Sequence, residues 1–351
     1  MVMESVRGRG GGADRGPSGR GRRSYKSWFA GLISAPVLAL ALTGASVTFW
    51  PDWPAFQTLA RVLDSLTLHM AAAAALGLGA MAWLGAPRAA VLLGAAAVAV
   101  ALTLTGQRYL SVSQPLAPDL PADITVLWFN MLAENATDPE TLAAALADSP
   151  ADVVMVTEAV PLTGQIDRLA QAFPVRAGCD TEGRCDFLVL SRIPGMRIKL
   201  YPLGRLQERR MAVVRLARPG EPPWTLVGLH MVKPWFFGIT ESEEWKMMYV
   251  LHRISGPLVL MGDLNAAPWS RRVHLLARRC ALATPRLPRP TWPAGAGWFG
   301  LPIDHVLVRE ARLTGLDRFG AGLGSNHLGL LARISLDGAD PDRPVPAACT
   351  P

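Results

Sequence analysis

The sequence lacks several features that would define its class directly. It has no internal repeat, which argues against a repeat architecture. Its four cysteines form no Cys-x-x-Cys pair and have no histidine pair nearby, so a thiolate-bound metal is not expected. No convincing small-x-small cleavage site follows the first apolar segment, and two further apolar segments come after it. These absences favour a retained membrane anchor over a cleaved signal peptide.

The excess of basic over acidic residues lies mostly in the N-terminal tail. The chain has a net charge of +7, and its first 26 residues, with seven basic and two acidic side chains, account for +5 of it. Only +2 therefore remains for the rest of the chain. Such a near-neutral domain argues against duplex nucleic acid as the main partner, because duplex binding usually needs a basic footprint. The tail itself, residues 1–26, is rich in Gly and Arg and is predicted to be disordered.

Long apolar runs follow the tail. Half of the residues in the chain are hydrophobic, and the mean hydropathy of +0.23 is high for a soluble protein. Three uncharged segments, about 28–49, 66–84 and 89–105, have lengths in or near the range that crosses a bilayer. We therefore predict a three-helix membrane anchor over residues 27–106.

The distribution of basic residues predicts the orientation of this anchor. The basic tail and Arg88, between the second and third segments, lie on one side, whereas Arg61 and Arg108 lie on the other. The positive-inside rule then places the N-terminus in the cytoplasm, and three crossings place everything after Gln107 outside. In a bacterial inner membrane, this multi-pass arrangement directs the following domain to the periplasm.

All four cysteines fall in the part that is predicted to be exported. Cys179 and Cys185 flank a short polar loop, residues 180–184, which a small disulfide between them would close. A buried thiol is a reasonable expectation for Cys280. The sequence leaves the pairing of Cys280 and Cys349 open.

The exported part reads as an α/β domain. Residues 107–121 are Pro-rich and are predicted to form a linker, and residues 338–351 form a C-terminal tail. Between them, residues 122–337 alternate short apolar strands with helical stretches. The expected elements include two helices, at 139–147 and 241–254, and an antiparallel strand pair, at 211–216 and 224–229.

Polar side chains recur at the ends or starts of the predicted strands. Six strand termini carry such a residue, which is hard to obtain by chance. Polar groups at strand termini converge on one rim of a sheet, where sites are built, so together they predict one site. The residues are Asn130, Glu158, His230, Asp263, Asn265, Asp304 and His327.

The most informative of these strand ends is Leu260–Ser270, which carries Asp263 and Asn265. In an extended segment, a spacing of two residues puts both side chains on one face. A carboxylate beside an amide at a strand end suits metal-assisted hydrolysis of a phosphoester. Because Gly-Asp and Asn are also common turn residues, a simple turn is the alternative for these residues alone.

The order of these motifs resembles the endonuclease/exonuclease/phosphatase superfamily, the DNase I-like hydrolases, over roughly residues 122–337. A membrane anchor before such a domain is similar to the bacterial membrane-bound branch of the superfamily. The resemblance implies a four-layer α/β sandwich, in which two packed mixed β-sheets lie between outer helices. The matching pieces are Trp-Phe-Asn130, Val-Thr-Glu158, Gly-Leu-His230, Gly-Asp263-Leu-Asn265, Ile-Asp304-His and Gly-Ser-Asn326-His327.

Two residues are expected to serve a metal ion. Glu158 would hold a divalent cation, Mg²⁺ or Mn²⁺, because these hard cations prefer carboxylate oxygen and take few protein ligands. Asn130, which lies beside it, would bind a phosphate oxygen or a metal-bound water. A carboxylate at a helix N-terminus is the structural alternative for Glu158.

The other residues are expected to perform the chemistry. His327 would be the general base, with Asp304 orienting its ring. Asp263 and Asn265 would position the nucleophile and stabilise the phosphorus centre. His230 would bind the phosphate or protonate the leaving oxygen, although a histidine after a strand is more often structural.

Asn326 departs from the pattern of the resembled family, which has Asp in the Ser-Asp-His motif. The amide is a poorer cation ligand than a carboxylate, so the departure weakens the case for a second metal ion. Asn326 is expected to be a weak ligand or an orienting residue.

The sequence therefore predicts a membrane-anchored, periplasm-facing phosphoesterase of the phosphodiesterase type that uses Mg²⁺ or Mn²⁺. Two partners are expected, the lipid bilayer and a phosphoester substrate. The substrate would be a lipid headgroup, a nucleotide or nucleic acid, and no obligate protein partner is predicted. The apolar loop Trp235–Phe237 would dip into the bilayer, cover the substrate or pack in the core. Two alternatives stay open: a metal-dependent nuclease acting on extracytoplasmic nucleic acid, and a catalytically impaired module that binds phosphorylated ligands.

Overall fold

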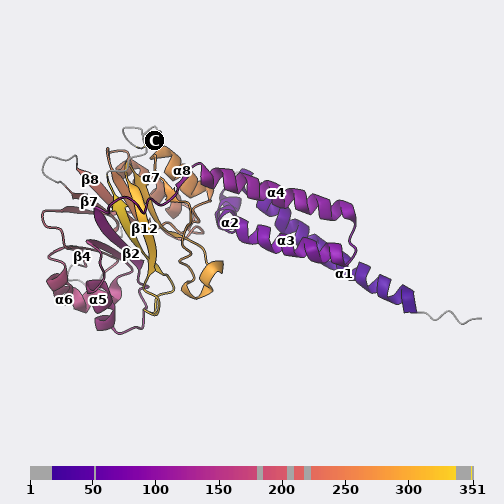
Figure 1. The fold of residues 1–351 in the computed structure, drawn as a ribbon, viewed down its shortest axis with the longest axis horizontal. Coiled ribbons are helices and arrows are strands. Elements are labelled where there is room, and N and C mark those ends of the chain that lie inside the picture. Colours follow the sequence, from indigo (N-terminus) through magenta and orange to yellow (C-terminus); the bar gives the residue numbers. More distant parts are fainter. Residues whose placement is uncertain are drawn as a thin grey trace, which may run out of the picture.

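The computed structural model describes residues 18–50, 53–179, 185–203, 209–216, 223–336 and Cys349. A bundle of long helices and an α/β domain lie end to end and give the molecule an elongated shape (Figure 1). Of the predicted segments, tail residues 1–17, the loop 180–184 and all of the C-terminal tail except Cys349 lie outside the described residues.

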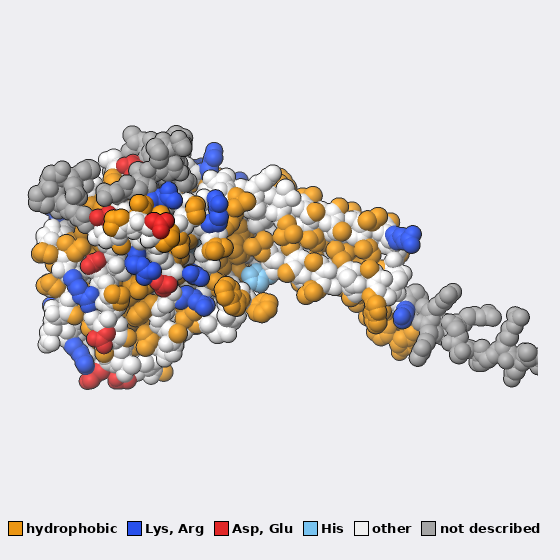
Figure 2. Space-filling model, in the orientation of Figure 1, with side chains coloured by type: hydrophobic (Ala, Val, Ile, Leu, Met, Phe, Trp, Pro, Cys, Tyr) orange, Lys and Arg blue, Asp and Glu red, His pale blue; other side chains and the backbone are white. Residues whose placement is uncertain are grey.

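The helical part contains α1 (Ser18–Ser46), α2 (Pro54–Ser65), α3 (Thr67–Trp83) and α4 (Arg88–Leu110), with the 3-10 helix η1 (Val47–Phe49) after α1. Among the described residues, Trp28–Phe49 and α4 are long and apolar enough to cross a membrane; a third span exists if α2 and α3, bent by 71°, count as one. Hydrophobic side chains cover much of the visible face of this bundle (Figure 2). The three-span anchor remains a prediction.

Several boundaries of the helical part differ from the sequence expectation. Helix α1 begins at Ser18, inside the predicted tail, and α4 continues to Leu110, inside the predicted linker. Helix α2 occupies a connection in which the sequence predicted no element. It begins with Pro54, whose missing N–H costs nothing at the start of a helix.

Two mixed sheets form the α/β domain. Among the described residues, one sheet has the order β12-β13-β2-β3-β5-β4 and the other the order β11-β9-β8-β7-β6. The pairs β2–β3 and β8–β9 are parallel, and the other neighbours in these sheets are antiparallel. The strands are β2 (Ile124–Asn130), β3 (Val153–Thr157), β4 (Val175–Gly178), β5 (Phe187–Ser191), β6 (Arg197–Pro202), β7 (Arg209–Leu216), β8 (Trp224–His230), β9 (Leu258–Asp263), β11 (Asp304–Arg309), β12 (Arg312–Phe319) and β13 (Gly329–Ser335).

Alternating side chains build the core in layers. In β2, Val126 and Trp128 pack between the two sheets, whereas Leu127 and Phe129 pack on the opposite face. That second face is covered by α5 (Pro139–Ala147) and α6 (Ile166–Ala172). The outer face of the other sheet is covered by α7 (Ile239–Leu251) and α8 (Arg271–Arg279). The predicted α/β fold with two mixed sheets and outer helices is confirmed.

Gly228 in β8 allows the two sheets to approach closely. A Cβ atom at this position would lie 2.4 Å from Met155 Sδ and 2.7 Å from Phe187 Cζ, which belong to the opposite sheet. Any larger residue would force these two side chains to move, which accounts for glycine at this position.

The predicted elements of the domain are largely present. Helix α5 has the predicted bounds, and β7 and β8 form the predicted antiparallel pair. The predicted linker is different, because part of it packs on the domain: Val112 is fully buried, and β1 (Ser113–Gln114) pairs in parallel with β10 (Thr284–Pro285). The prolines of the segment indicated an extended chain but could not indicate that it would find a partner.

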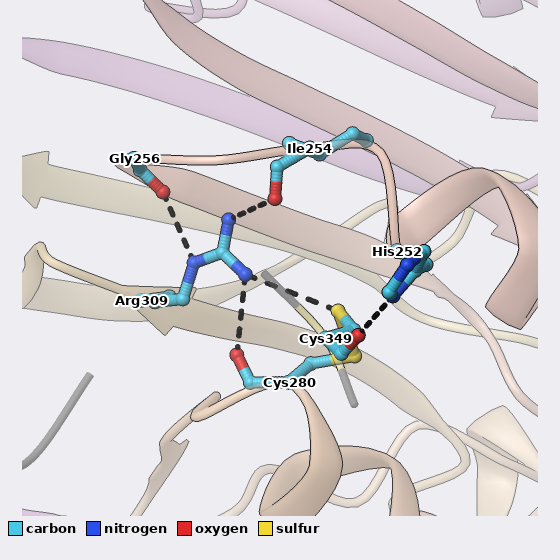
Figure 3. The surroundings of a disulfide bond; sticks show 6 residues. All are labelled: His252, Ile254, Gly256, Cys280, Arg309 and Cys349. Atoms are coloured by element: carbon cyan, nitrogen blue, oxygen red, sulfur yellow. Dashed lines mark hydrogen bonds between the residues drawn. A yellow bond between two sulfur atoms is a disulfide. The ribbon is translucent and has the colours of Figure 1, made fainter. Parts of the chain in front are cut away.

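Both pairs of cysteines are joined. Cys179 bonds to Cys185, as predicted, and Cys280 bonds to Cys349, where the sequence favoured a buried thiol for Cys280. The second disulfide fastens Cys349 over the end of β11 (Figure 3). There the Arg309 guanidinium donates to the backbone carbonyls of Ile254, Gly256 and Cys280.

Candidate active site

The polar strand ends converge on one rim, where the two sheets meet. In the sheet register, Asn130 at the end of β2 is paired with Thr157, the residue before Glu158. In the other sheet, Asp263 at the end of β9 is paired with both His230 and Asp304. The hydrogen bond from Asn130 Nδ2 to Asp263 Oδ2, at 3.1 Å, is one of several that join the two halves of the rim.

The backbone turns sharply at this rim. Leu132, Glu158 and Asn265, each within two residues of a strand end, adopt positive φ angles of 68°, 51° and 49°. Non-glycine residues rarely adopt this left-handed conformation, and such residues are concentrated at functional sites. The turns redirect the chain at the point where the polar side chains are gathered.

His327 lies between two buried aspartates. Its Nδ1 donates to Asp304 Oδ2 at 2.9 Å, which leaves Nε2 facing Asp263 Oδ2 at 3.8 Å. Asp304 is itself held by Trp128 Nε1, which donates to Asp304 Oδ1 at 2.8 Å. The ring of His327 is therefore fixed in one orientation, with one nitrogen turned toward the rim, which is the geometry of a general base.

Burial and neighbouring negative charge both shift the pKa values of this group. Burial and the nearby Asp304 raise the pKa of Asp263 to about 7. Burial disfavours a charged His327, but Asp304, Asp263 and Glu158 outweigh it and raise the pKa of the imidazole to about 9. The site thus attracts positive charge strongly.

His230 and Glu158 form the other side of the rim. His230 Nε2 lies 3.7 Å from Glu158 Oε1 and 3.8 Å from Asp263 Oδ2. Its Nδ1 is hydrogen-bonded to Thr157 Oγ1 at 2.8 Å, which fixes the ring. Burial, with a further contribution from Arg210, holds the pKa of His230 well below its usual value. His327 therefore favours the charged form and His230 the neutral form; positive charge added at the rim would lower the pKa of His327 and free its Nε2 to accept a proton.

Asn130 connects these groups. Its Nδ2 also lies 3.4 Å from Glu158 Oε1, and its Oδ1 accepts from the backbone N–H of Leu132. The other oxygen of Glu158, Oε2, accepts from the backbone N–H of Ala133. The carboxylate is thus oriented by hydrogen bonds rather than by a helix N-terminus.

Asn265 is placed differently from the expectation. Strand β9 ends at Asp263, and the left-handed conformation of Asn265 means that the two side chains are not on one face of an extended segment. Instead, the backbone N–H of Asn265 donates to Asp263 Oδ1, and its amide Nδ2 donates to Met231 O. The turn interpretation was therefore correct for the backbone, while Asp263 still faces the site.

Asn326 is exposed at the edge of the rim. Its backbone carbonyl accepts from Ala294 N–H at 2.8 Å. The neighbouring Ser325 Oγ donates to Asn130 O and accepts from the backbone N–H of His327. The Ser-Asn-His segment thus fixes the position of His327.

Sequence reasoning missed the residues that orient the site. Trp128 Nε1 donates to the Asp304 carboxylate, and Thr157 Oγ1 is hydrogen-bonded to His230. Thr291 Oγ1 accepts from the backbone N–H of Asp304. Trp128 lies two residues before Asn130 in β2, on the same face of the strand, so its spacing was a usable signal. Thr291 lies in a loop rich in Gly and Pro and gave no such signal.

A cleft opens beside Glu158 and His230. Lys233 and Arg210 also line it, and Phe236 lies at its edge. Arg210 is buried, with its Nη1 bonded to Glu243 Oε1 at 3.0 Å. This cleft can receive an anionic group next to the rim.

The residues of the rim fit a divalent cation. Among the described residues, Asp263, Asp304 and His327 each offer a ligand atom, and these atoms lie within 4.8 Å of one another. The raised pKa of Asp263 means that this acidic group is short of compensating positive charge. Carboxylate oxygens in such a cluster are the donors that Mg²⁺ and Mn²⁺ prefer.

This two-sheet fold gathers carboxylates and histidines at one rim. Residues 127–327 match the model of the Endonuclease/Exonuclease/phosphatase family. The match covers more than half of the chain, and the chain belongs to this family. Members of the family are phosphoester hydrolases.

The chain also has similarity to solved structures at low sequence identity. An endonuclease/exonuclease/phosphatase from Beutenbergia cavernae is 20% identical, with 62% of this chain and 73% of that chain covered at a TM-score of 0.49. D. rerio TDP2 complexed with a single-strand DNA product is 13% identical (60% and 98% covered, TM-score 0.48). The human Nocturnin catalytic domain with bound sulfate is 14% identical (65% and 98% covered, TM-score 0.44). No curated protein matches the chain.

Proposed function

We propose that this chain is a membrane-anchored, divalent-metal-dependent phosphodiesterase whose catalytic domain faces the periplasm. The convergence of Asp263, Asp304 and His327 opposite Glu158 and His230 is the observation that supports it most. Membership of the family supports phosphoester hydrolysis as the type of reaction.

The reaction we assign is attack of water on phosphorus with cleavage of one P–O ester bond. His327 Nε2 accepts a proton from the attacking water, and Asp304 holds the ring and stabilises its charge. Neutral His230 binds a phosphoryl oxygen through Nε2–H, and the leaving oxygen takes its proton from solvent. The water oxygen stays on phosphorus, so the products are one phosphate monoester and one alcohol.

Glu158 and Asp263, with Asn130 between them, are the groups that would hold Mg²⁺ or Mn²⁺. When bound, the cation supplies positive charge that stabilises the phosphoryl oxygens and lowers the pKa of a coordinated water. Asn130 Nδ2 is a donor in the same place and would bind a phosphate oxygen.

The adjoining cleft also contains a group that would bind a negative charge of the substrate. Lys233 lines it together with Glu158 and His230. An ammonium group beside the rim would bind an anionic oxygen of the substrate, and Phe236 would contact an apolar part. The cleft thus suits an ester that combines charge with apolar surface.

Hydrolysis of a simple diester tests the proposal. The full-length protein, purified in detergent, is expected to release p-nitrophenol from bis(p-nitrophenyl) phosphate with Mg²⁺ and to stop on addition of EDTA. His327→Asn should reduce the rate by about 10²–10⁴-fold, as expected for loss of a general base. His274→Asn, which changes a histidine of α8 outside the rim, is the matched control and should retain the rate. An active His327→Asn variant would contradict the assignment of the base, and absence of turnover in the unchanged protein would favour the ligand-binding module.

The membrane orientation is tested separately. A phosphatase reporter fused after Leu110, at the end of α4, should be active in the periplasm, whereas one fused at Gly85, between α3 and α4, should be inactive. The reverse pattern would overturn the orientation without affecting the assignment of the reaction.

A further inference from the structure

Helix α2 exposes apolar side chains and turns its charged side chains toward the protein, which is the opposite of a helix on the surface of a soluble protein. Phe56 and Leu59 are 46% and 50% exposed. The charged residues face the protein instead: Arg61 forms a 2.8 Å ion pair with Glu241 of α7, and Asp64 forms a 3.0 Å ion pair with Arg108 of α4. A helix that buries its charges and exposes its apolar residues is suited to contact with lipid.

The bend before α3 gives α2 a suitable direction. Helices α2 and α3 meet at Leu66 at an angle of 71°. If α3 crosses the bilayer, α2 therefore runs close to the plane of the membrane surface. Phe49 and Trp53, at the end of the first apolar segment, are also exposed. Exposed aromatic rings at this level are typical of the interfacial belt of membrane proteins.

A second element reaches the same level from the catalytic domain. Residues 291–301, the aromatic hairpin, are closed at the base by hydrogen bonds from Thr291 and Trp292 N–H to Leu301 O. The tip is the 3-10 helix η4 (Ala294–Phe299), and its Trp298 and Phe299 are 83% and 84% exposed. Two adjacent aromatic side chains with so little protein around them form an apolar projection.

The tip of the hairpin is fixed beside the helical bundle. Phe299 O accepts from His69 Nε2 at 2.9 Å. His69 is the third residue of α3, so it lies only about 3 Å along the axis from the start of that helix. Trp298 and Phe299 are therefore level with the end of α3 that borders the catalytic domain, where the interfacial aromatic belt is expected.

The base of the hairpin is bonded to the catalytic rim. Thr291 Oγ1 accepts from the backbone N–H of Asp304, and Thr291 O accepts from Leu328 N–H, next to His327. Ala294 N–H donates to Asn326 O. The aromatic hairpin is thus bonded at its base to the segments that carry Asp304 and His327, while its tip lies where the bilayer surface is expected.

A separate cleft lies between α2 and the domain. Arg61, Asp64, Glu244 and Arg272 line it, with Arg272 Nε paired to Glu244 Oε1 at 2.8 Å. Asn265, two residues after Asp263, also lines it. Arg61 Nη1 and Arg272 Nη2 are buried and have no hydrogen-bond partner among the described residues. Buried guanidinium N–H groups without a partner are costly, and a phosphate oxygen is the acceptor that fits them.

We propose that α2 and the aromatic hairpin form one bilayer-contact surface, which holds the catalytic rim against the outer lipid surface, and that the substrate is a phosphodiester lipid of that leaflet. The inference rests on the proposed function, because it names the substrate class of the same site. The lipid phosphate would enter by the cleft beside α2. Hydrolysis adds water across one P–O bond and yields a phosphate monoester and an alcohol, one of which keeps the acyl chains.

The activity test compares two substrates in the same sample. Full-length protein in nanodiscs of phosphatidylglycerol and phosphatidylethanolamine is assayed for hydrolysis of these lipids and of bis(p-nitrophenyl) phosphate. The double variant Trp298→Ser/Phe299→Ser should lose at least about tenfold in lipid hydrolysis and change less than about twofold on the soluble ester. The matched double variant Trp298→Leu/Phe299→Leu removes the same rings but stays apolar, and it should keep at least half of the lipid activity.

The outcomes separate this inference from the proposed function. Hydrolysis of the soluble ester without hydrolysis of either lipid would overturn the lipid substrate and leave the phosphodiesterase intact. Loss of both activities to the same degree in the serine variant would overturn the bilayer-contact role of the hairpin. No hydrolysis of the soluble ester by the unchanged protein would overturn the proposed function, and this inference with it.

A label tests the contact itself, independently of turnover. Phe299→Cys, labelled with a nitrobenzoxadiazole dye, should be quenched strongly by doxyl lipids in the nanodisc. Gln171→Cys is the control, since Gln171 is exposed on α6, at the end of the domain remote from the helical bundle (Figure 1). Equal quenching at the two positions would contradict the contact.

Discussion

Strand β11 has a buried charged residue at each end, and the two ends are built in opposite ways. At its start, Asp304 lies with Asp263 and His327 in a group whose negative charge is not balanced. At its end, Arg309 donates to three backbone carbonyls and lies under the Cys280–Cys349 disulfide (Figure 3). The two environments lie on one strand, so neither burial nor secondary structure distinguishes them.

The difference lies in how the charge is compensated. Arg309 donates to backbone carbonyl groups that compensate its charge. Asp304 and Asp263 have mainly each other, His327 and single donors, so their arrangement is favourable only when positive charge is added. We therefore interpret the Arg309 end as structural. We interpret the Asp304 end as a binding site whose unfavourable electrostatics are relieved when a cation binds.

The largest effect is expected at the Asp304 end. Asp304→Asn keeps the shape and the bond from Trp128 but removes the charge that stabilises a protonated His327. We expect the rate on the soluble diester to fall by about 10²–10⁴-fold, while the melting temperature stays the same or rises. A fall in melting temperature with an unchanged rate would reverse the roles of the two ends.

The second effect concerns the disulfide that closes the Arg309 end. Cys280→Ser/Cys349→Ser should destabilise the domain by about 4 kcal/mol at most, because the bond joins residues 69 apart in sequence. Cys179→Ser/Cys185→Ser, which opens a loop with a separation of only 6, should cost about half as much. Thermal unfolding of both variants measures the ratio. Equal shifts would indicate that loop closure is not the source of the stabilisation.

The third effect concerns the guanidinium itself. Arg309→Met keeps an unbranched side chain but leaves the three carbonyl groups without a donor. We expect a loss of about 3 kcal/mol in the free energy of unfolding and an unchanged rate per folded molecule. Arg318→Met, in an exposed part of β12, is the control and should change stability by less than about 0.5 kcal/mol. A loss of rate in Arg309→Met at unchanged stability would link this end of β11 to catalysis.

The smallest effect is a pH dependence at the junction of α4 and α8. Burial lowers the pKa of His274, whose Nδ1 donates to Arg108 O. Because the folded value lies below the unfolded one, the stability is present above about pH 6.5 and is lost as the pH falls toward the folded value. His274→Gln keeps a donor and does not titrate, so its melting temperature should fall less between pH 7.5 and pH 5. The difference should be about 2 °C or less, since the side chain is only half-buried. An identical fall in melting temperature in both proteins would show that His274 does not contribute to the pH dependence.

The sequence predicted the elements whose signal is local. Helix α5 and the pair β7–β8 have apolar patterns of one clear period, and the rim residues Asn130, Glu158 and Asp263 follow recognisable apolar strands. The convergence of these residues followed from the general rule that strand termini meet at a rim.

The parts that escaped prediction depend on partners distant in sequence. Helix α2 hides its charges against α4 and α7, and its exposed apolar face is unusual for a connection. The bonds from Trp128 to Asp304 and from Thr157 to His230 cross between strands, so no local pattern encodes them. Asn265 lies in a turn, as its residue type favours, whereas the sequence analysis placed it in an extended segment.

The most direct test of the account is the Mg²⁺ dependence of diester hydrolysis in Glu158→Gln. The exchange keeps the size of the side chain and removes one negative oxygen donor from the rim. We predict that the Mg²⁺ concentration for half-maximal rate rises by at least about tenfold in this variant. It should remain unchanged in Glu140→Gln, the control on α5. An unchanged Mg²⁺ dependence in Glu158→Gln would contradict the claim that this rim is a metal-dependent active site.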